Sequence, residues 1–197
     1  MISIANINHS REIAEIHKKT IVDGFLSKLG INFLSILYEF LIKNELVLVY
    51  LENNKVVGFV SCALNSAGII KKFIFSKPKA IFILLKKIIF NPLLILPVFE
   101  TSKSTSSSTN DFYDNILPKT ELLSISVLPL TQHKGIGTLL LKNLENQLLQ
   151  KKISIYKVIA GDNLKNANLF YLKNGFELKN KIQIHKDETS NVYIKQI

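Results

Sequence analysis

Residues 121–149 limit the fold of this chain more than any other stretch, because they read as a strand, a short polar turn and a helix in immediate succession. Apolar and β-branched residues dominate Glu121 to Val127, which is typical of a buried strand. After Leu128 and Pro129 the chain becomes polar, and apolar side chains then recur at three- and four-residue spacing, which predicts a helix. The helical positions are Ile136, Leu139, Leu140, Leu144 and Leu148.

The turn in this unit has the composition of an anion-binding loop. Gly135 and Gly137 fall where the helix is expected to begin, and Lys134 precedes them. The first amides of a helix have no partner within the helix, and the helix dipole places partial positive charge there. Glycines let an anion approach these amides closely. The predicted loop consists of Gln132, His133, Lys134, Gly135, Ile136, Gly137 and Thr138.

Three anion-binding patterns compete for this loop, and two of them fail. A Walker loop requires its lysine after the glycines, whereas Lys134 comes before them. A dinucleotide fingerprint requires a third glycine where the chain has Leu140. The third pattern is a hydrophobic-x-Val-x-Pro strand followed by Gln-x-x-Gly-x-Gly, and it fits Ile125, Val127, Pro129, Gln132, Gly135 and Gly137. The stretch thus resembles the coenzyme A pyrophosphate loop of the GNAT superfamily of acyl-CoA N-acyltransferases.

A second motif downstream resembles the same superfamily. Its pattern is Ala-x-x-x-Tyr-x-x-x-Gly-Phe, and it is carried by Ala167, Tyr171, Gly175 and Phe176. One position departs from the family pattern. The asparagine that often stands three residues before the alanine is replaced by leucine in this chain, so the resemblance leaves two neighbours for contact with the cofactor. These are Asn163 and Asn166.

The resemblance implies an α/β (α+β) fold with a mixed central sheet of about six to seven strands and helices on both faces. A helical insertion, about residues 66–110, is expected between strands 3 and 4 of a single domain spanning 1–197. Earlier in the chain, residues 2–7 read as a strand, and a first helix is expected from Ser10, with Ile13, Ala14 and Ile16 following. Residues 32–43 read as a second helix, and 46–51 and 56–64 as a strand pair. This order is also the order at the start of GNAT proteins.

The resemblance also implies a cofactor and a division of roles. Acetyl-CoA is the expected co-substrate, with its diphosphate on the amides of the loop and no metal involved. Its pantetheine arm is expected along the main chain of Ile125, Ser126 and Val127, with a backbone N–H near Val127 facing the thioester carbonyl. Tyr171 is expected to protonate the leaving thiolate. Glu121 is the best-placed general base by chain order, although an amine with a pKa depressed by burial needs none.

The acceptor is less constrained by the sequence. The phrase from Gly24 to Tyr38 resembles a GNAT branch often associated with bacterial cell-surface polysaccharide gene clusters. In the family, the connection between the first two helices lines the acceptor pocket, so Asp23, Phe25 and Leu26 are expected near the substrate. We therefore expect direct attack by a primary amine of a small acceptor, such as an amino sugar, in a ternary complex. Two alternatives stay open: a peptide or protein amine, and a non-catalytic, membrane-associated module that binds acyl-CoA.

The expected insertion is rich in lysine and apolar residues. Pro78, Pro92 and Pro97 divide it, and no apolar run reaches the roughly 20 residues of a membrane-spanning helix. Residues 69–99 are suited either to peripheral contact with an anionic bilayer or to packing as a lid or interface, including an interface with a second copy of the chain. Residues 101–110 are of low complexity and read as a loop.

Composition limits the compartment and the partners. The chain of 197 residues is 47% hydrophobic and has a net charge of +10, with Arg11 as its one arginine. Because readers of nucleic acid rely on arginine forks, nucleic acid is not the expected main partner. The single cysteine, Cys62, excludes an internal disulfide and is expected to be buried. No signal sequence is recognisable, which favours a cytoplasmic location. We expect His9 and His17 to be solvated or capping residues.

Overall fold

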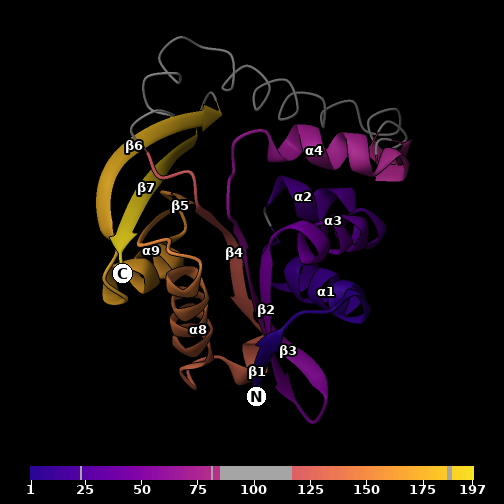
Figure 1. The fold of residues 1–197 in the computed structure, drawn as a ribbon, viewed down its shortest axis with the longest axis horizontal. Coiled ribbons are helices and arrows are strands. Elements are labelled where there is room, and N and C mark those ends of the chain that lie inside the picture. The colour runs from indigo at the N-terminus through magenta and orange to yellow at the C-terminus, as the bar shows by residue number, and fades with distance from the viewer. Residues whose placement is uncertain (23, 81, 85–116, 186–187) are drawn as a thin grey trace.

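The computed structural model describes residues 1–22, 24–80, 82–84, 117–185 and 188–197. Seven strands form one sheet in the order β1-β2-β3-β4-β5-β7-β6 (Figure 1). All neighbouring strands are antiparallel except β4 and β5, which are parallel. The strands are β1 (Ile2–Ile4), β2 (Leu46–Glu52), β3 (Lys55–Ala63), β4 (Glu121–Val127), β5 (Ile155–Gly161), β6 (Glu177–His185) and β7 (Glu188–Gln196).

Helices cover both faces of this sheet. In Figure 1, α1 to α4 lie on one side of β1 to β4 and α8 lies on the other. The described α-helices are α1 (Ser10–Thr20), α2 (Phe25–Leu29), α3 (Ile31–Asn44), α4 (Ile69–Ser76), α8 (Ile136–Gln150) and α9 (Lys165–Lys173), with short 3-10 turns η1 (Ile7–His9) and η3 (Pro129–Thr131). The predicted fold class, a mixed sheet with an insertion between the third and fourth strands, is confirmed.

The two faces of the sheet bury separate cores. On the α8 side, Leu140, Leu144 and Leu148 are fully buried against the sheet, as their spacing predicted, whereas Leu139 is 45% exposed. On the α1 and α3 side, the core includes Ile13 and Leu34. Burying both faces explains why β2 and β3 read as nearly continuous apolar runs. Cys62 is buried in the core on the α8 side of the sheet.

The first strand is shorter than predicted. Residues 2–7 were expected to be extended, but β1 ends at Ile4 and η1 begins at Ile7. The side chain of Asn6 accepts a hydrogen bond from the amide of Asn8 at 3.0 Å, and Asn6 in turn donates its amide to Nδ1 of His9. This reciprocal cap starts a helical turn at the point where alternation alone suggested that the strand continued.

The two ends of the insertion between β3 and β4 are hydrogen-bonded to each other and to a residue of β5. The amide of Ser66 donates to the carbonyl of Lys119 at 2.8 Å. The ammonium of Lys157 lies 3.2 Å from the hydroxyl of Ser66 and also donates to the carbonyl of Pro118. Within the insertion, α4 confirms one helical piece, while the predicted loop at 101–110 and most of 69–99 lie outside the described residues. Among the described helices, none combines the length and the apolar character needed to cross a bilayer.

Candidate active site

The central feature of the site is a strand that is paired along only part of one edge. β4 pairs with β3 as far as Val127, but its parallel pairing with β5 is limited to Glu121 and Leu122. The amide of Leu128 donates to the carbonyl of Val57 at 2.8 Å. Because residues alternate along an antiparallel ladder, Ile125 and Val127 turn their amides and carbonyls away from β3. These backbone groups form an edge to which an extended ligand can add as a strand.

A bulge interrupts β4 just before this edge. Leu122 pairs with Cys62 and Ser124 pairs with Ser61, so two successive residues of β3 face three of β4, and Leu123 is the extra residue. As a result Leu123 and Ser124 both face α1 and α3: Leu123 packs against that core and Ser124 contacts a residue of α3. No local pattern predicts this bulge, because Leu123 and Ser124 fit a regular strand.

The predicted anion loop follows directly from β4. The side-chain amide of Gln132 donates to the carbonyl of Val127 at 2.8 Å. His133 and Gly135 have left-handed backbone conformations, with φ of 61° and 76°. The ladder of α8 begins with the bond from the amide of Leu139 to the carbonyl of Gly135, so the three preceding amides lie in the open first turn. These amides belong to Ile136, Gly137 and Thr138.

The two glycines of the loop have different roles. A side chain at Gly135 would meet no atom within 4 Å, so the space in front of the helix start is open. A Cβ at Gly137 would lie 3.3 Å from the ring of Phe170 in α9, so this glycine permits close packing of α8 and α9. The side chains of Gln132, His133 and Lys134 are exposed around the opening. This arrangement of open amides, open space and one lysine fits a diphosphate.

Tyr171 lies behind the loop in α9 and is 6% exposed. Its ring packs in edge contacts with Phe170 and Phe176, at centroid distances of 5.6 and 5.4 Å. Burial raises the pKa of the Tyr171 phenol above its usual range, so the hydroxyl stays protonated throughout the neutral range. Phe170 touches Tyr171 and also limits the space at Gly137, which ties the position of the tyrosine to that of the loop.

Glu121 stands at the beginning of β4 and is held by a lysine. Its carboxylate lies 3.4 Å from the ammonium of Lys157, and the two side chains are only 18% and 10% exposed. Lys157 was not singled out from the sequence, where it appears as one polar residue in an apolar strand. The two residues are also backbone partners. β4 and β5 pair at two positions, Glu121 with Lys157 and Leu122 with Val158, so the ion pair lies within this short ladder.

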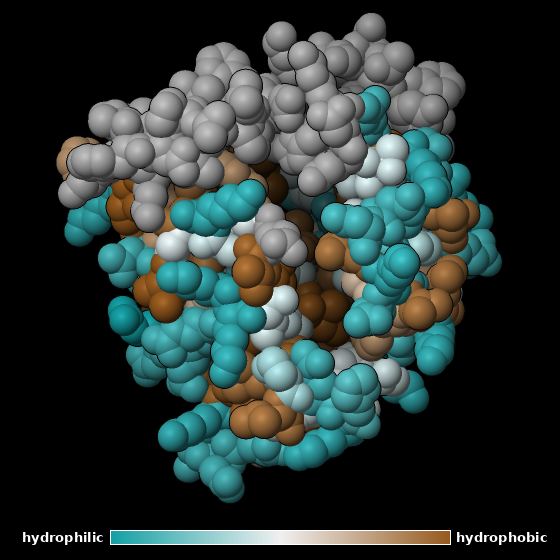
Figure 2. All heavy atoms as spheres, turned by 180° about the vertical axis from the view of Figure 1, so that it is seen from behind, coloured by the Kyte–Doolittle hydropathy of each residue, from teal (hydrophilic) through white to brown (hydrophobic). Residues whose placement is uncertain are grey.

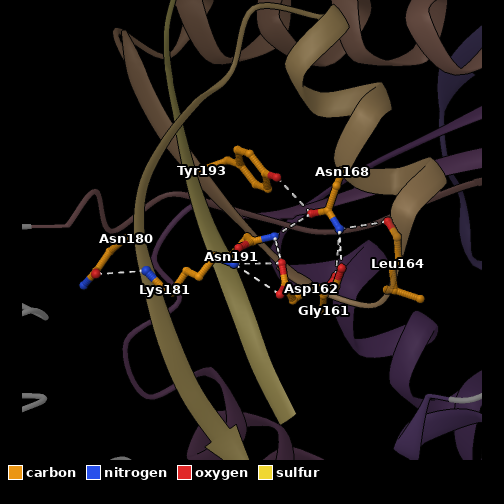
Figure 3. Close-up of polar contacts among 8 residues, drawn as sticks. All are labelled: Gly161, Asp162, Leu164, Asn168, Asn180, Lys181, Asn191 and Tyr193. Atoms are coloured by element: carbon orange, nitrogen blue, oxygen red, sulfur yellow. Dashed lines mark hydrogen bonds and ion pairs between the residues drawn. The ribbon is translucent and has the colours of Figure 1, made fainter.

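The asparagines predicted to contact the cofactor are at the surface, and a third asparagine organises the turn (Figure 3). Asn163 and Asn166 are exposed. Asn168, which sequence reasoning missed, donates to the carbonyls of Gly161 and Leu164 at 2.9 Å each. Its own carbonyl accepts hydrogen bonds from Asn191 and Tyr193 of β7 at 3.1 and 2.9 Å. The only signal available was its position one residue after Ala167 in the motif.

This asparagine network continues to the edge of the sheet. Asp162 accepts hydrogen bonds from Asn191 at 2.9 Å and from Lys181 of β6 at 3.1 Å. These hydrogen bonds and the charge of Lys181 lower the pKa of the Asp162 carboxyl. The network therefore fixes the turn between β5 and α9 from both sides, and with it the start of the helix that carries Tyr171.

The expected acceptor residues lie at the start of α2. Phe25 and Leu26 are half-buried and pack against the core beneath α1 and α3, whereas Asp23 lies outside the described residues. Seen from the opposite face (Figure 2), the surface is hollowed near its middle, and hydrophobic side chains lie at the bottom of the hollow.

A buried polar chain connects α1, α3 and β4 on the same side of the sheet. Nδ1 of His17 lies 2.6 Å from the hydroxyl of Tyr38, which lies 3.1 Å from the hydroxyl of Ser124. The prediction that His17 is solvated or capping is wrong: it is 4% exposed, because it falls four residues after Ile13 on the inward face of α1. Burial lowers the pKa of His17 to about 4, so its imidazole is neutral at neutral pH. In the part of the chain that the structure describes, no group of three His, Cys, Asp or Glu side chains is arranged to hold a metal.

Comparisons with known proteins agree with this architecture. Residues 105–178 match the family model of the acetyltransferase (GNAT) domain. The N-acetyltransferase from Staphylococcus aureus Mu50 has a TM-score of 0.62 at 15% identity, covering 100% of this chain and 97% of its own. A Salmonella typhimurium acetyltransferase solved with acetyl-CoA has a TM-score of 0.61 at 14% identity, with coverage of 100% and 92%. The ribosomal-protein-alanine N-acetyltransferase from Brucella melitensis has a TM-score of 0.62 at 14% identity, with coverage of 100% and 99%. A search of curated proteins found no significant match.

Proposed function

We propose that the chain is a member of the GNAT superfamily of acetyltransferases, whose family model matches residues 105–178, and that it transfers an acetyl group from acetyl-CoA to the primary amine of a small acceptor. The acceptor attacks directly, in a ternary complex with the donor. The observation that carries the proposal is the continuity of two features: the open backbone edge of β4 at Ile125 and Val127, and the open first turn of α8.

These two features match the two ends of the donor. The diphosphate of coenzyme A is an anion suited to the amides of Ile136, Gly137 and Thr138, with the charge of Lys134 nearby. The pantetheine arm carries amides that pair with an unpaired strand edge in the manner of an added strand. With the diphosphate on the loop, the arm lies along Ile125, Ser126 and Val127 and carries the thioester toward the beginning of β4.

Transfer then requires one bond to form and one to break. The neutral amine nitrogen attacks the thioester carbonyl, a C–N bond forms, and the C–S bond breaks as the thiolate leaves. Tyr171 gives its proton to the thiolate, because its buried phenol is protonated over the working range of pH. The amine loses one proton, and Glu121 is the proposed acceptor of it, directly or through water. Its ion pair with Lys157 competes with that role, which makes Glu121→Gln an informative variant.

A small, hydroxylated acceptor agrees with the side chains on the α1 and α3 face of β4. Ser124 and Ser126 both point to this face, and Ser126 donates to the hydroxyl of Thr20 at 2.7 Å. Such hydroxyls suit the polar groups of an amino sugar. The half-buried side chains of Phe25 and Leu26 supply apolar contact at the start of α2.

The experiment is a turnover assay with acetyl-CoA and a panel of primary amines. The panel contains free and nucleotide-linked amino sugars, polyamines, and peptides with a free α-amine or a lysine. Thiol release is followed continuously, and the product is identified by the added mass of one acetyl group. We expect an amino sugar to be the preferred acceptor. Preference for a peptide would overturn the choice of acceptor, and absence of turnover with bound acetyl-CoA would overturn the proposed activity.

A further inference from the structure

We propose that the hydroxyl of Ser124 hydrogen-bonds the attacking amine, and that Tyr38 and His17 are positioning residues that fix the direction of this hydroxyl. The inference rests on the proposed function and adds to it a group that holds the acceptor nitrogen. Ser124 was not a site candidate from the sequence, because it is one of two serines alternating with apolar residues in the central strand.

The geometry gives Ser124 a special place on β4. The bulge at Leu123 turns Ser124 toward α1 and α3, where its hydroxyl lies 3.1 Å from that of Tyr38. It precedes Ile125, whose backbone groups face the open edge proposed for the donor. The side chain of Ser124 therefore stands at the junction between the donor edge and the side of the sheet that holds α2.

The buried chain behind Ser124 constrains which way each hydroxyl points. His17 is neutral because of its burial, and its ring nitrogen is a stronger acceptor than a hydroxyl oxygen. With Nδ1 as acceptor, Tyr38 donates to His17 and its oxygen accepts the proton of Ser124. The oxygen of Ser124 then accepts from the hydroxyl of Ser61 and keeps one lone pair for a further donor, such as the N–H of a neutral amine.

The depth of the chain separates this role from that of an ordinary surface serine. Tyr38 is 1% exposed, and His17 is stacked on Phe59 at a ring distance of 6.4 Å. Ser124 itself is partly exposed, so the chain runs from fully buried residues to a residue that is not fully buried. The hydroxyl of Ser61 lies 2.8 Å from that of Ser124 and supports it from β3. A rigid hydroxyl lowers the entropic cost of aligning the amine.

Three variants test the proposal: Ser124→Ala, Tyr38→Phe and His17→Gln. Tyr156→Phe is the matched control, because Tyr156 is also a buried, hydrogen-bonded tyrosine, but it lies in the other core and donates to Glu145. Ser124→Thr is the conservative variant that keeps the hydroxyl. For each protein, acetyl-CoA affinity is measured by calorimetry, and thiol release from acetyl-CoA is measured with glucosamine and with water as acceptors.

We expect Ser124→Ala and Tyr38→Phe to lower kcat/KM for the acceptor about fivefold or more, the loss of one hydrogen bond, with acetyl-CoA affinity within twofold of the parent. His17→Gln should give a smaller loss, and Ser124→Thr should restore most of the activity. If glucosamine is not used, the same pattern is expected for hydrolysis. Equal rates for Ser124→Ala and the parent, an equal loss in Tyr156→Phe, or bound acetyl-CoA without any thiol release would overturn the inference. Failure of the parent to bind acetyl-CoA would instead overturn the proposed function.

Discussion

The side-chain amide of Gln132 donates a 2.8 Å hydrogen bond to the main-chain carbonyl of Val127. This bond joins the first residue of the loop to the last residue of β4, so the proposed diphosphate site and the proposed pantetheine edge are held as one unit. The same bond occupies the carbonyl of Val127, at the end of the open edge. We therefore expect bound acetyl-CoA to pair with the backbone groups of β4 that precede this carbonyl, and its diphosphate to contact the loop that follows.

Loss of this bond should weaken donor binding. Gln132→Leu removes the donor while keeping similar volume, and a hydrogen bond of this kind contributes about 1 kcal/mol. We expect the calorimetric Kd for acetyl-CoA to rise about fivefold, with little change in Tm because Gln132 is exposed. Gln150→Leu, at the exposed C-terminal end of α8, is the control. An unchanged Kd for Gln132→Leu would show that the loop holds its shape without this bond.

Removal of the Tyr171 hydroxyl should affect chemistry and spare binding. In Tyr171→Phe the ring contacts with Phe170 and Phe176 are kept, and only the proposed proton donor is lost. General acids typically contribute at least about 100-fold, so we expect kcat to fall by that order while acetyl-CoA affinity stays within twofold. Tyr156→Phe, whose ring packs against Phe176 in the same aromatic cluster, should retain most of its turnover. A parallel loss of affinity in Tyr171→Phe would contradict an acid role.

Lys157 should be a major contributor to stability. It is 8% exposed, pairs with Glu121 and donates to groups at both ends of the insertion. Removing one partner of a buried pair leaves the other charge uncompensated, so Lys157→Met should lower the free energy of unfolding by about 3 kcal/mol in urea titrations. The double variant Lys157→Met/Glu121→Gln should recover part of the loss. A double variant no more stable than Lys157→Met would mean that the carboxylate is not what Lys157 stabilises.

His17 should make stability depend on pH in a defined window. Its pKa falls from 6.5 in the unfolded chain to about 4 in the folded protein, so between these values only the unfolded chain binds the proton. Stability therefore rises with pH across this window, and the group contributes about 3 kcal/mol above pH 6.5 that is lost as the pH falls toward 4. Urea unfolding at several pH values should show a shallower dependence for His17→Gln than for the parent. Identical slopes would contradict a neutral, buried imidazole.

Much of the fold was accessible from the sequence where local signals agreed. The strand, turn and helix around Gly135 were predicted together, because periodicity, glycine placement and strand composition all point to the same unit. The short first strand was mispredicted, because the Asn6 cap outweighed an alternating pattern of only six residues. Burial of His17 follows from its helical phase, which is visible in the sequence, whereas its polarity alone suggests exposure.

The details of the site depend on tertiary contacts that single residues do not reveal. No local feature marks Leu123 as a bulge, since the extra residue is defined by its pairing with β3. Asn168 gains its role from β7, which follows it by more than twenty residues, and Lys157 gains its role from both ends of the insertion. The chemistry of the loop was therefore predictable, whereas the residues that hold Tyr171, Ser124 and Glu121 in place were not.

The most direct test of the proposed donor site is a calorimetric titration of acetyl-CoA into the parent and into Gly135→Glu, with Gly68→Glu as the matched control. Gly68 has a similar left-handed conformation at the start of α4, and a Cβ there also meets nothing within 4 Å, so both variants carry similar strain and added charge. We expect micromolar-range binding to the parent and to Gly68→Glu, and loss of binding in Gly135→Glu alone. Equal binding to all three folded proteins, or none to the folded parent, would contradict a donor site at the start of α8.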